Sequence, residues 1–439
     1  LAPLLLLFGL LAVNKKIRRF SWTFLIVSVA GIIALFSQYQ QPWFKANPIL
    51  HDLSFNKSTF QTRRLSWEGA ARDFRFHPWL GTGFGNYAII FDRQFDPDFF
   101  NYSVTETYFD RAHNNLIDIA STAGIIGLAA YLSIFAAAAW DWRRALKIAG
   151  GRILPGKDGN RVRELLVIAA LLSAYFIQNL AVFDSLVTYM GLMIALAYLV
   201  FSAQVEKDEE EAEARLKIPQ EMTVLILSLI LVFISIFLFT LRPWFMLNRV
   251  IKAYSYIAQS QVSSGFSEYH RAFEMNTPLD RDGRTTLINV VINNPTIFTQ
   301  LSEKDFREEF DFVLSLLEAN LAYNPDDSLT QMQAAQTYDI ISRYYSNQPA
   351  IFKEYSDKAL AAINHSLDSS PRRIPIYFIL AQIQANRGDL PAAGAALEKA
   401  ASLNPDYAET SCQLANYYFL VRMTLIAITL IVVWTIMAR

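Results

Sequence analysis

The residues best suited to chemistry lie in one stretch, Arg63 to Leu128, of this 439-residue chain. The stretch is rich in arginine, histidine, glycine and aromatic residues, and it runs directly into a long apolar segment. Arginine holds phosphate oxygens with a planar fork that stays charged, and histidine exchanges protons near neutral pH. The rest of the sequence is typical of membrane spans and helical repeats, so we expect any chemistry to reside here.

A glycine-rich segment within this stretch, Gly81 to Gly85 (GTGFG), has a spacing also found in nucleotide-binding loops. Such a loop binds phosphates when a strand precedes it and a helix follows it in a βαβ unit. Neither flanking signal is evident, which argues against a nucleotide site. We interpret the glycines with Pro78 as a tight turn, and Trp79 as an anchor at a membrane interface.

Three short motifs follow one another along the stretch. They are Arg64-Leu65-Ser66-Trp67, the run from His77 to Asn86 (HPWLGTGFGN), and His113-Asn114-Asn115, with Gly124 eleven positions after His113. Together they resemble the O-antigen ligase/polymerase family of bacterial membrane glycosyltransferases. The resemblance implies transfer of a glycan from a polyprenyl-pyrophosphate carrier to an acceptor hydroxyl on the extracytoplasmic side, without a nucleotide sugar, a cofactor or a metal.

The resemblance also implies roles for individual residues. Arg64 matches the arginine expected on the pyrophosphate, although the adjacent Arg63 could take its place. His113 is the expected general base near the acceptor hydroxyl. A second arginine is expected near the pyrophosphate, and we favour Arg111, two residues from His113, over Arg93. Taken without the family, His113 could be an interfacial anchor or a helix cap, and each arginine an interfacial or structural residue.

His113 precedes a predicted span at residues 115–140. Eleven residues make about three helical turns, so Gly124 should lie on the same face, roughly 16 Å deeper in the membrane. With Ala120 and Gly127 it forms a stripe of small residues, which predicts the close approach of a neighbouring helix.

Polar residues within apolar segments are further candidates for the site, because they usually face a bundle interior or a cavity. Asp118 lies little more than one turn inside the predicted span. Gln178, Asn179 and Asp184 lie at an outer turn between two later spans. Alternatively, these side chains bond to neighbouring helices, with Asp118 paired to Gln178 or Asn179.

The composition excludes an ordinary soluble enzyme, because 53% of the residues are hydrophobic and only 18% are charged. A formal net charge of −1 gives no sign of nucleic-acid binding. The single cysteine leaves no intramolecular disulfide and no thiolate metal cluster, and the scattered histidines indicate no metal site.

Two basic segments, Lys15–Arg19 and residues 143–163, predict the orientation, because such loops stay in the cytoplasm. The motif loop and the region after residue 241 are then extracytoplasmic. The apolar runs that we interpret as spans are Leu1–Val13, Phe20–Phe36, 115–140, 165–182, 186–201 and Met222–Leu241, and Met423–Met437 could be a last one. The first run is short and has no initiator methionine, so we expect an N-terminally truncated chain. Glu206–Arg215 is a charged linker without an assigned role.

Small residues and prolines in the last third of the chain follow the spacing of a tetratricopeptide repeat, whose unit is about 34 residues. The positions are Ala381, Gly388, Asp389, Ala393, Leu397, Ala400 and Pro405, and Pro371 lies one unit before Pro405. The preceding unit, with Ala335 and Ala359, carries about twelve extra residues. Residues 252–278 and 304–324 are interpreted as degenerate repeats.

The sequence therefore predicts an all-α protein, a polytopic membrane helix bundle (GT-C-like) with an extracytoplasmic α-solenoid (TPR-like) domain. The predicted parts are residues 1–36 (membrane helices), 37–113 (motif loop), 114–241 (membrane helices with cytoplasmic loops), 242–420 (repeats) and 421–439 (a possible last membrane helix).

The predicted function is a membrane glycosyltransferase of the bacterial cytoplasmic membrane. Its donor would be the lipid-linked glycan, and its acceptor a glycolipid, a polysaccharide or a protein, with the repeats binding a protein partner. A repeat-unit polymerase and a protein O-oligosaccharyltransferase remain open within the family. A non-enzymatic membrane anchor with recruiting repeats is the alternative from another class. A transporter is disfavoured, because no pair of broken helices is evident.

Overall fold

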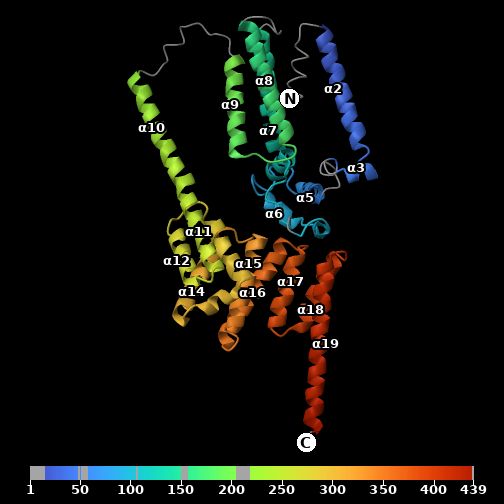
Figure 1. The fold of residues 1–439 in the computed structure, drawn as a ribbon, viewed down its shortest axis with the longest axis vertical. Coiled ribbons are helices and arrows are strands. Elements are labelled where there is room, and N and C mark those ends of the chain that lie inside the picture. The colour runs from blue at the N-terminus through green and yellow to red at the C-terminus, as the bar shows by residue number, and fades with distance from the viewer. Residues whose placement is uncertain are drawn as a thin grey trace. The chain divides into compact units, whose positions relative to one another are not determined.

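The computed structural model describes residues 15–47, 50, 58–104, 107–149, 157–203 and 218–437. Every regular element in these ranges is a helix, which confirms the all-α prediction (Figure 1). The chain folds as two compact units, Leu1–Glu213 and Ala214–Arg439, and each is considered by itself. The apolar run Leu1–Val13 and the charged linker Glu206–Arg215 lie outside the described residues.

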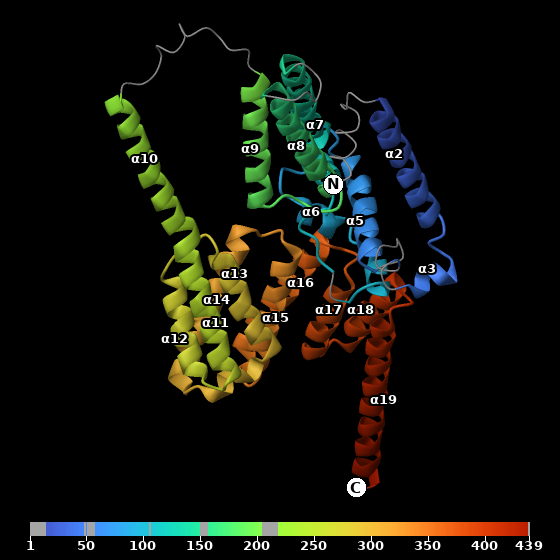
Figure 2. The same cartoon turned by 45° about the horizontal axis from the view of Figure 1, so that its top comes forward.

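The first unit contains the motif stretch and three long helices, α7 to α9. These three helices lie side by side (Figure 2) around an apolar core of Ala138, Ala145, Val162, Leu165, Leu192, Ala195 and Leu199. The elements of the unit are α2 (Lys15–Phe36), α3 (Pro42–Ala46), α5 (Ser58–Phe74), α6 (Tyr87–Arg93), η1 (Pro97–Asn101), α7 (Asn115–Ile148), α8 (Lys157–Gln178) and α9 (Leu186–Ala203).

Three helices in the described part of the chain are long and apolar enough to cross a membrane: α7, α9 and the continuous helix Met222–Ala258. Much of their surface is exposed apolar side chain, including the whole of the most apolar window of the last helix. Such a surface is unstable in water and suits a lipid environment. The chain is therefore a membrane protein.

Helix α7 is broken at Gly124, whose φ of 68° and ψ of −170° lie in a region that only glycine occupies readily. Asn115 Nδ2 lies 3.2 Å from Tyr131 Oη, although sixteen residues of continuous helix would separate these two positions by about 24 Å. The two halves of α7 are therefore folded back toward each other. The predictions that Gly124 lies deeper along one straight helix face, and that a neighbouring helix packs against it, are wrong.

The glycine-rich loop, residues 76–86, occupies the break with its residues 78–83. It restores the backbone hydrogen bonds that the break removes from α7, two from each side. The four bonds join Thr82 N to Ser121 O (3.1 Å), Gly83 N to Thr122 O (2.8 Å), Ile125 N to Pro78 O (2.9 Å) and Ile126 N to Trp79 O (3.4 Å). The predicted turn is present, with positive φ at Gly81, Gly83 and Gly85, and its partner is α7.

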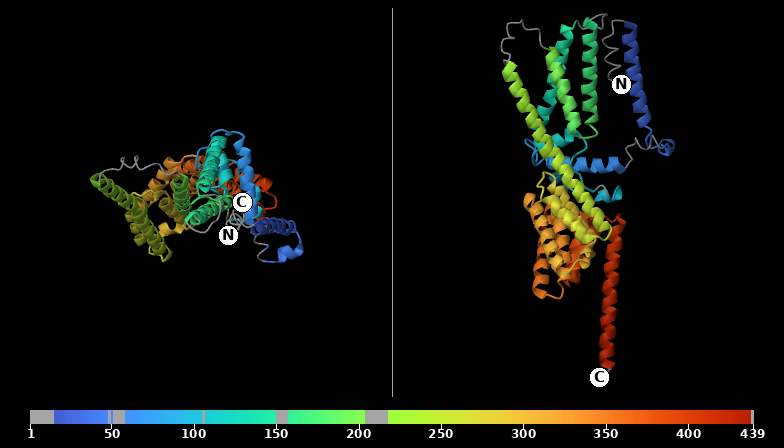
Figure 3. Two further views of the ribbon diagram at one scale, coloured as in Figure 1. Left: turned by 90° about the horizontal axis from the view of Figure 1, so that it is seen from above. Right: turned by 60° about the vertical axis from the view of Figure 1, so that its left-hand side comes forward.

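The second unit begins with one long helical rod, in which α10 (Ile218–Ile236) passes through a π-helical turn (Phe237–Leu241) into α11 (Arg242–Ala258) (Figure 3). Antiparallel pairs of helices follow along the chain, and successive pairs stack on one another. The pairs are α11 with α12, α13 with α14, α15 with α16, and α17 with α18. The elements after α11 are α12 (Val262–Phe273), α13 (Asp280–Asn293), η4 (Pro295–Gln300), α14 (Glu303–Tyr323), α15 (Ser328–Tyr344), α16 (Pro349–Ser369), α17 (Ile374–Asn386), α18 (Leu390–Leu403) and α19 (Ala408–Met437). This stacking of pairs is TPR-like.

The α17–α18 pair shows why the repeat spacing works. Ala381 and Ala393 are buried where the helices touch, and Gly388 turns the chain with a φ of 85°. Asp389 caps α18 by accepting a hydrogen bond from Ala392 N at 3.0 Å. The extra residues of the preceding unit lengthen its helices, to 17 residues in α15 and 21 in α16. The final apolar run, Met423–Met437, is the second half of α19, and its place in a membrane stays a prediction.

Candidate active site

Helix α5 carries the two motif arginines and packs through a stripe spaced three or four residues apart. The buried residues are Thr62, Leu65, Ser66, Gly69, Ala70 and Asp73. Next to this stripe, Trp67 donates from Nε1 to the carbonyl of Ala112 at 2.6 Å. The tryptophan of the first motif thus fixes the backbone immediately before the histidine of the third.

The two adjacent arginines of α5 have different surroundings. Arg63 Nη1 donates to the carbonyl of Ala181 at 2.9 Å, in the turn between α8 and α9. Arg64 is exposed and lies 3.6 Å from Glu68, one turn along the same helix. Of the two candidates for the pyrophosphate arginine, the structure therefore brings Arg63 to the α8–α9 turn and leaves Arg64 on the outer face of α5.

His113 has a left-handed backbone, with a φ of 52°, that residues other than glycine adopt at a cost. Its ring is half-buried between two aromatic rings, with its centroid 5.4 Å from that of Phe109 and 5.2 Å from that of Phe183. Phe183 lies two residues after Ala181, which binds Arg63. The imidazole and the Arg63 guanidinium therefore approach the same short turn.

The residues after His113 anchor it from both sides. Asn114 caps α7 through its Oδ1, which accepts from the backbone N–H groups of Leu116 and Ile117, and its Nδ2 donates to Leu180 O at 3.0 Å. The backbone N–H of Asn115 donates to Asn179 O at 2.7 Å. The left-handed turn at His113 is thus held by bonds to the α8–α9 turn, which is the condition for keeping a strained residue.

Asp184 joins the three elements around the histidine. Its carboxylate accepts from Asn115 Nδ2 at 2.9 Å, from Asn179 Nδ2 at 3.0 Å and from Thr188 Oγ1 at 3.2 Å. These donors belong to the start of α7, the end of α8 and the start of α9. Of the three polar residues predicted at the outer turn, Asn179 and Asp184 therefore meet, with Asp184 as the central acceptor, and Gln178 does not join them.

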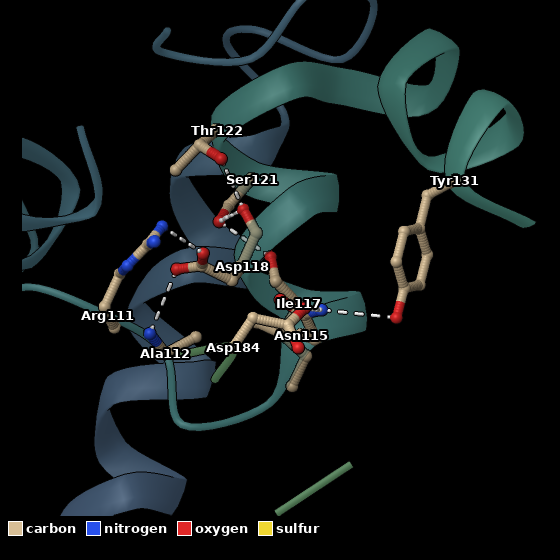
Figure 4. Close-up of polar contacts among 9 residues, drawn as sticks. All are labelled: Arg111, Ala112, Asn115, Ile117, Asp118, Ser121, Thr122, Tyr131 and Asp184. Carbon is tan, nitrogen blue, oxygen red and sulfur yellow. Dashed lines mark hydrogen bonds and ion pairs between the residues drawn. The ribbon is translucent and has the colours of Figure 1, made fainter. Parts of the chain in front are cut away.

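Asp118 is buried and holds the segment before His113 (Figure 4). One carboxylate oxygen accepts from Arg111 Nη1 at 3.0 Å, and the other accepts from the backbone N–H of Ala112 at 3.1 Å. Asp118 therefore bonds to Arg111 and Ala112, not to Gln178 or Asn179. Arg111 is partly exposed beside His113, and the centre of the Phe84 ring lies 6.0 Å from its guanidinium carbon.

Two further candidates lie elsewhere in the local structure. Arg93 donates to Asp73 Oδ1 at 3.0 Å, and the other oxygen of this buried carboxylate accepts from Thr82 Oγ1 at 3.2 Å. Arg93 thus belongs to the bonds that hold the glycine-rich loop on α5. Gln178 ends α8 with an exposed side chain. The sequence did not predict the buried position of Asp73, because an acidic residue among arginines on a polar helix is usually solvent-exposed.

The site combines a constrained imidazole, two guanidinium groups and apolar surroundings. Arg63 bonds to the turn that also carries Phe183, which contacts the His113 ring, and Arg111 lies two residues before His113 in the sequence. Burial of the Tyr87 hydroxyl, which shares a 2.7 Å hydrogen bond with Ser66, raises the pKa of Tyr87 above its usual value. This tyrosine stays neutral and joins α5 to α6 as a structural residue.

Comparison with known proteins identifies a domain within the first unit. No curated protein matches the chain. One solved structure, the crystal structure of a thermophilic TPR protein from Thermus thermophilus, is 18% identical, with a TM-score of 0.30 over 40% of this chain and 82% of that chain. The family model described as O-antigen ligase (Wzy_C) matches residues 1–132. This match covers less than a third of the chain and lies within the unit that holds the candidate active site.

Proposed function

We propose that this protein is a membrane glycosyltransferase that moves a glycan from a polyprenyl-pyrophosphate carrier to an acceptor hydroxyl. The reaction would take place at the outer face of a bacterial cytoplasmic membrane and would need no metal. The observation that carries the proposal is the strained, half-buried His113, held between arginine-bearing segments within the part of the chain that matches the O-antigen ligase family. A residue kept in a costly conformation by many bonds is a mark of a functional site.

His113 would act as the general base. Its imidazole takes the proton of the acceptor hydroxyl while the acceptor oxygen forms the new bond to the anomeric carbon of the glycan. The bond from that carbon to the pyrophosphate oxygen breaks, and the polyprenyl pyrophosphate leaves with the electron pair. The rings of Phe109 and Phe183 limit the orientations of the imidazole.

Arg63 and Arg111 would bind the pyrophosphate and stabilise the charge that develops on it as it leaves. Each guanidinium has five N–H donors. Arg63 is held through Nη1 by its bond to Ala181, and Arg111 is held through Nη1 by its bond to Asp118. Asp118 neutralises part of the charge of Arg111, so Arg63 is the stronger candidate for direct contact. Arg64 remains the second candidate from the sequence motif.

An apolar groove between the second half of α7 and α8 supports a lipid-linked donor. Its volume is about 510 Å³, and Ser173 is the one lining residue with a polar side chain other than the indole of Trp142. A flexible isoprenoid chain suits such a surface, because it buries apolar area without needing a hydrogen bond. The lining residues are Leu132, Phe135, Ala138, Ala139, Trp142, Ala169, Leu172, Ser173, Phe176 and Ile177.

The stacked repeats favour an acceptor or partner that is a protein, because solenoids of helix pairs present extended surfaces to partners. We therefore keep protein O-glycosylation beside ligation to a glycolipid and polymerisation of repeat units. A membrane anchor without activity is the competing class, and the experiment on His113 separates it from an enzyme.

The test is His113→Ala in the full-length protein with purified lipid-linked donor, with product formation and donor binding measured separately. Loss of the base should lower transfer by about 10²–10⁴-fold, with donor binding nearly unchanged. His365→Ala is the matched control, because His365 is a partly exposed histidine of the repeats paired with Asp326, and this variant should transfer normally.

Full transfer activity in His113→Ala would remove the base assignment. Absence of transfer in the unaltered protein, with every acceptor class supplied, would favour the anchor. Transfer that stops when a chelator is added would point to a metal, contrary to the proposal.

A further inference from the structure

The glycine-rich loop carries four large apolar side chains that point away from the protein. The exposed fractions are 70% for Phe76, 67% for Trp79, 71% for Leu80 and 67% for Phe84. The loop backbone itself is well packed, because it fills the break in α7. Firmly held backbone with outward apolar side chains indicates a surface that meets another apolar medium.

The position of these side chains identifies that medium. Trp79 O accepts from Ile126 N, and the backbone of Trp79 lies so close to Gly124 that a Cβ there would come within 2.2 Å of it. Trp79 and Leu80 thus lie at the first turn of the second half of α7. Ile125 and Ile126 in that turn are themselves 44% and 55% exposed, and they begin the apolar surface of a candidate span.

Several backbone groups of the loop are bonded within the protein, as a position at membrane depth requires. Irregular backbone is tolerated there only when its polar groups are bonded within the protein. The four bonds to α7 satisfy groups on both segments, and Gly81 N and Asn86 N donate within the loop to His77 O and Gly83 O. The loop therefore offers its apolar side chains to lipid without leaving these backbone groups unpaired.

We propose that the glycine-rich loop is a membrane-inserted element, with the side chains of Phe76, Trp79, Leu80 and Phe84 embedded in the lipid leaflet at which the second half of α7 begins. Arg75 is exposed next to this surface and would reach lipid phosphates, and tryptophan is favoured at the same depth. The lipid surface would hold the loop, and through it the broken α7 that carries Asp118. This inference needs no assumption about catalysis.

The experiment measures collisions of a nitroxide label with a lipid-soluble quencher, oxygen, and a water-soluble nickel chelate, in full-length protein reconstituted into vesicles. The exposed Cys412 is first changed to Ala. Single cysteines are then introduced by Leu80→Cys in the loop, Ile126→Cys on the span and Asp98→Cys, an exposed polar position in η1.

The label at Leu80 should resemble the label at Ile126, with an oxygen-to-nickel ratio several-fold above that at Asp98. A nickel accessibility at Leu80 equal to that at Asp98 would overturn the proposal. Water access that disappears only when a glycan donor is added would likewise overturn it, because the aromatic surface would then bind sugars.

A second measurement does not depend on cysteine substitutions. Brominated lipids quench tryptophan emission at short range, so Trp79→Phe should remove part of the lipid-quenched signal of the unaltered protein while keeping an apolar side chain in place. A quenched signal of the same size in Trp79→Phe would show that Trp79 is outside the leaflet and would reject the insertion.

Discussion

At the scale of single residues, Arg63 and Arg64 form a matched pair on α5. Arg63→Lys keeps the charge but loses the planar fork that bonds to Ala181 and would grip the pyrophosphate. We expect donor affinity and transfer rate to fall together, by roughly 10–100-fold if one or two charge-assisted hydrogen bonds are lost. Binding assays with lipid-linked donor and initial rates of transfer measure both quantities.

Arg64→Lys is the control for this prediction. Arg64 has an exposed ion pair with Glu68, and such pairs contribute about 0–1 kcal/mol, so this variant should behave like the unaltered protein. The reverse result, with activity lost at Arg64 and kept at Arg63, would restore the assignment that the sequence motif favours. Sequence alone could not separate the neighbours, because which arginine meets the α8–α9 turn depends on how α5 is rotated.

The bonds around His113 likewise could not be predicted from the sequence alone. The histidine and its two asparagines are visible as a motif, but the role of Asp184 depends on Asn115 and Asn179 reaching it from other helices. Polar residues in apolar segments were expected to find partners inside a bundle, and Asp118, Asn179 and Asp184 have such partners in the structure, whereas Gln178 is exposed. Their partners follow from three-dimensional packing, which the local pattern does not encode.

At the scale of elements, the break in α7 is the feature that the sequence did not predict. Residues 115–148 have the apolar content of one long span, and a glycine inside such a pattern is equally compatible with a close helix crossing. The deciding contact comes from residues 78–83, more than thirty positions earlier. The repeats were easier to predict, because each unit repeats its own local spacing and needs only its neighbours.

The break can be tested with Gly124→Ala. A Cβ at Gly124 would meet the backbone of Trp79 at 2.2 Å, and alanine disfavours its left-handed φ. Strain of this kind costs about 1–3 kcal/mol, and the clash adds to it. We expect a lower melting temperature of the full-length protein and weaker hydrogen-exchange protection of α7.

Two controls separate the clash from the backbone strain. Gly85 has a φ of 84° with no atom within 4 Å of an added Cβ, so Gly85→Ala should show the conformational cost alone. Gly191 lies within α9 with equally open space, and Gly191→Ala should be neutral or slightly stabilising. A Gly124→Ala variant no less stable than Gly191→Ala would contradict a break in α7 that is filled by the glycine-rich loop.

The first helix pair of the repeats should respond to acid. Glu268 is buried on α12 and accepts hydrogen bonds from Lys252 at 3.0 Å and Arg249 at 2.9 Å, and these partners lower the pKa of its carboxyl group. A lowered folded-state pKa gives stability that is present above the unfolded value, about 4.3, and is lost as the pH falls through the folded value. Hydrogen-exchange protection of α11 and α12 should therefore decrease in acid below about pH 4.

Glu268→Gln is the control for the acid response, because it keeps the size of the side chain and removes its titration. Its protection at neutral pH should be lower than in the unaltered protein, since Lys252 and Arg249 lose their charged acceptor. Protection of α11 and α12 should then change little between neutral pH and pH 4. An equally steep acid loss in this variant would assign the response to other groups.

At the scale of the whole molecule, the number of membrane crossings between the site and the repeats decides whether they share a side. α7, α9 and the helix Met222–Ala258 meet the length and hydropathy of spans. α8 starts with a polar segment, and its apolar part, residues 165–178, would measure about 21 Å against a hydrocarbon core of about 30 Å. Packing of α8 against α7 and α9 through Leu165 and Leu172 supports a fourth crossing.

We predict that α8 crosses, so that α5, η1 and the repeats lie together outside the cytoplasm, as the basic segment after α7 also indicates. In intact spheroplasts carrying the Cys412→Ala background, a membrane-impermeant thiol reagent should label Asp98→Cys in η1 and Asn347→Cys in the turn between α15 and α16. Ile148→Cys, at the far end of α7, should be labelled only after the membrane is opened. Labelling of Asp98→Cys without Asn347→Cys would mean an odd number of crossings. The repeats would then be on the opposite side from the site and could not present an acceptor to His113.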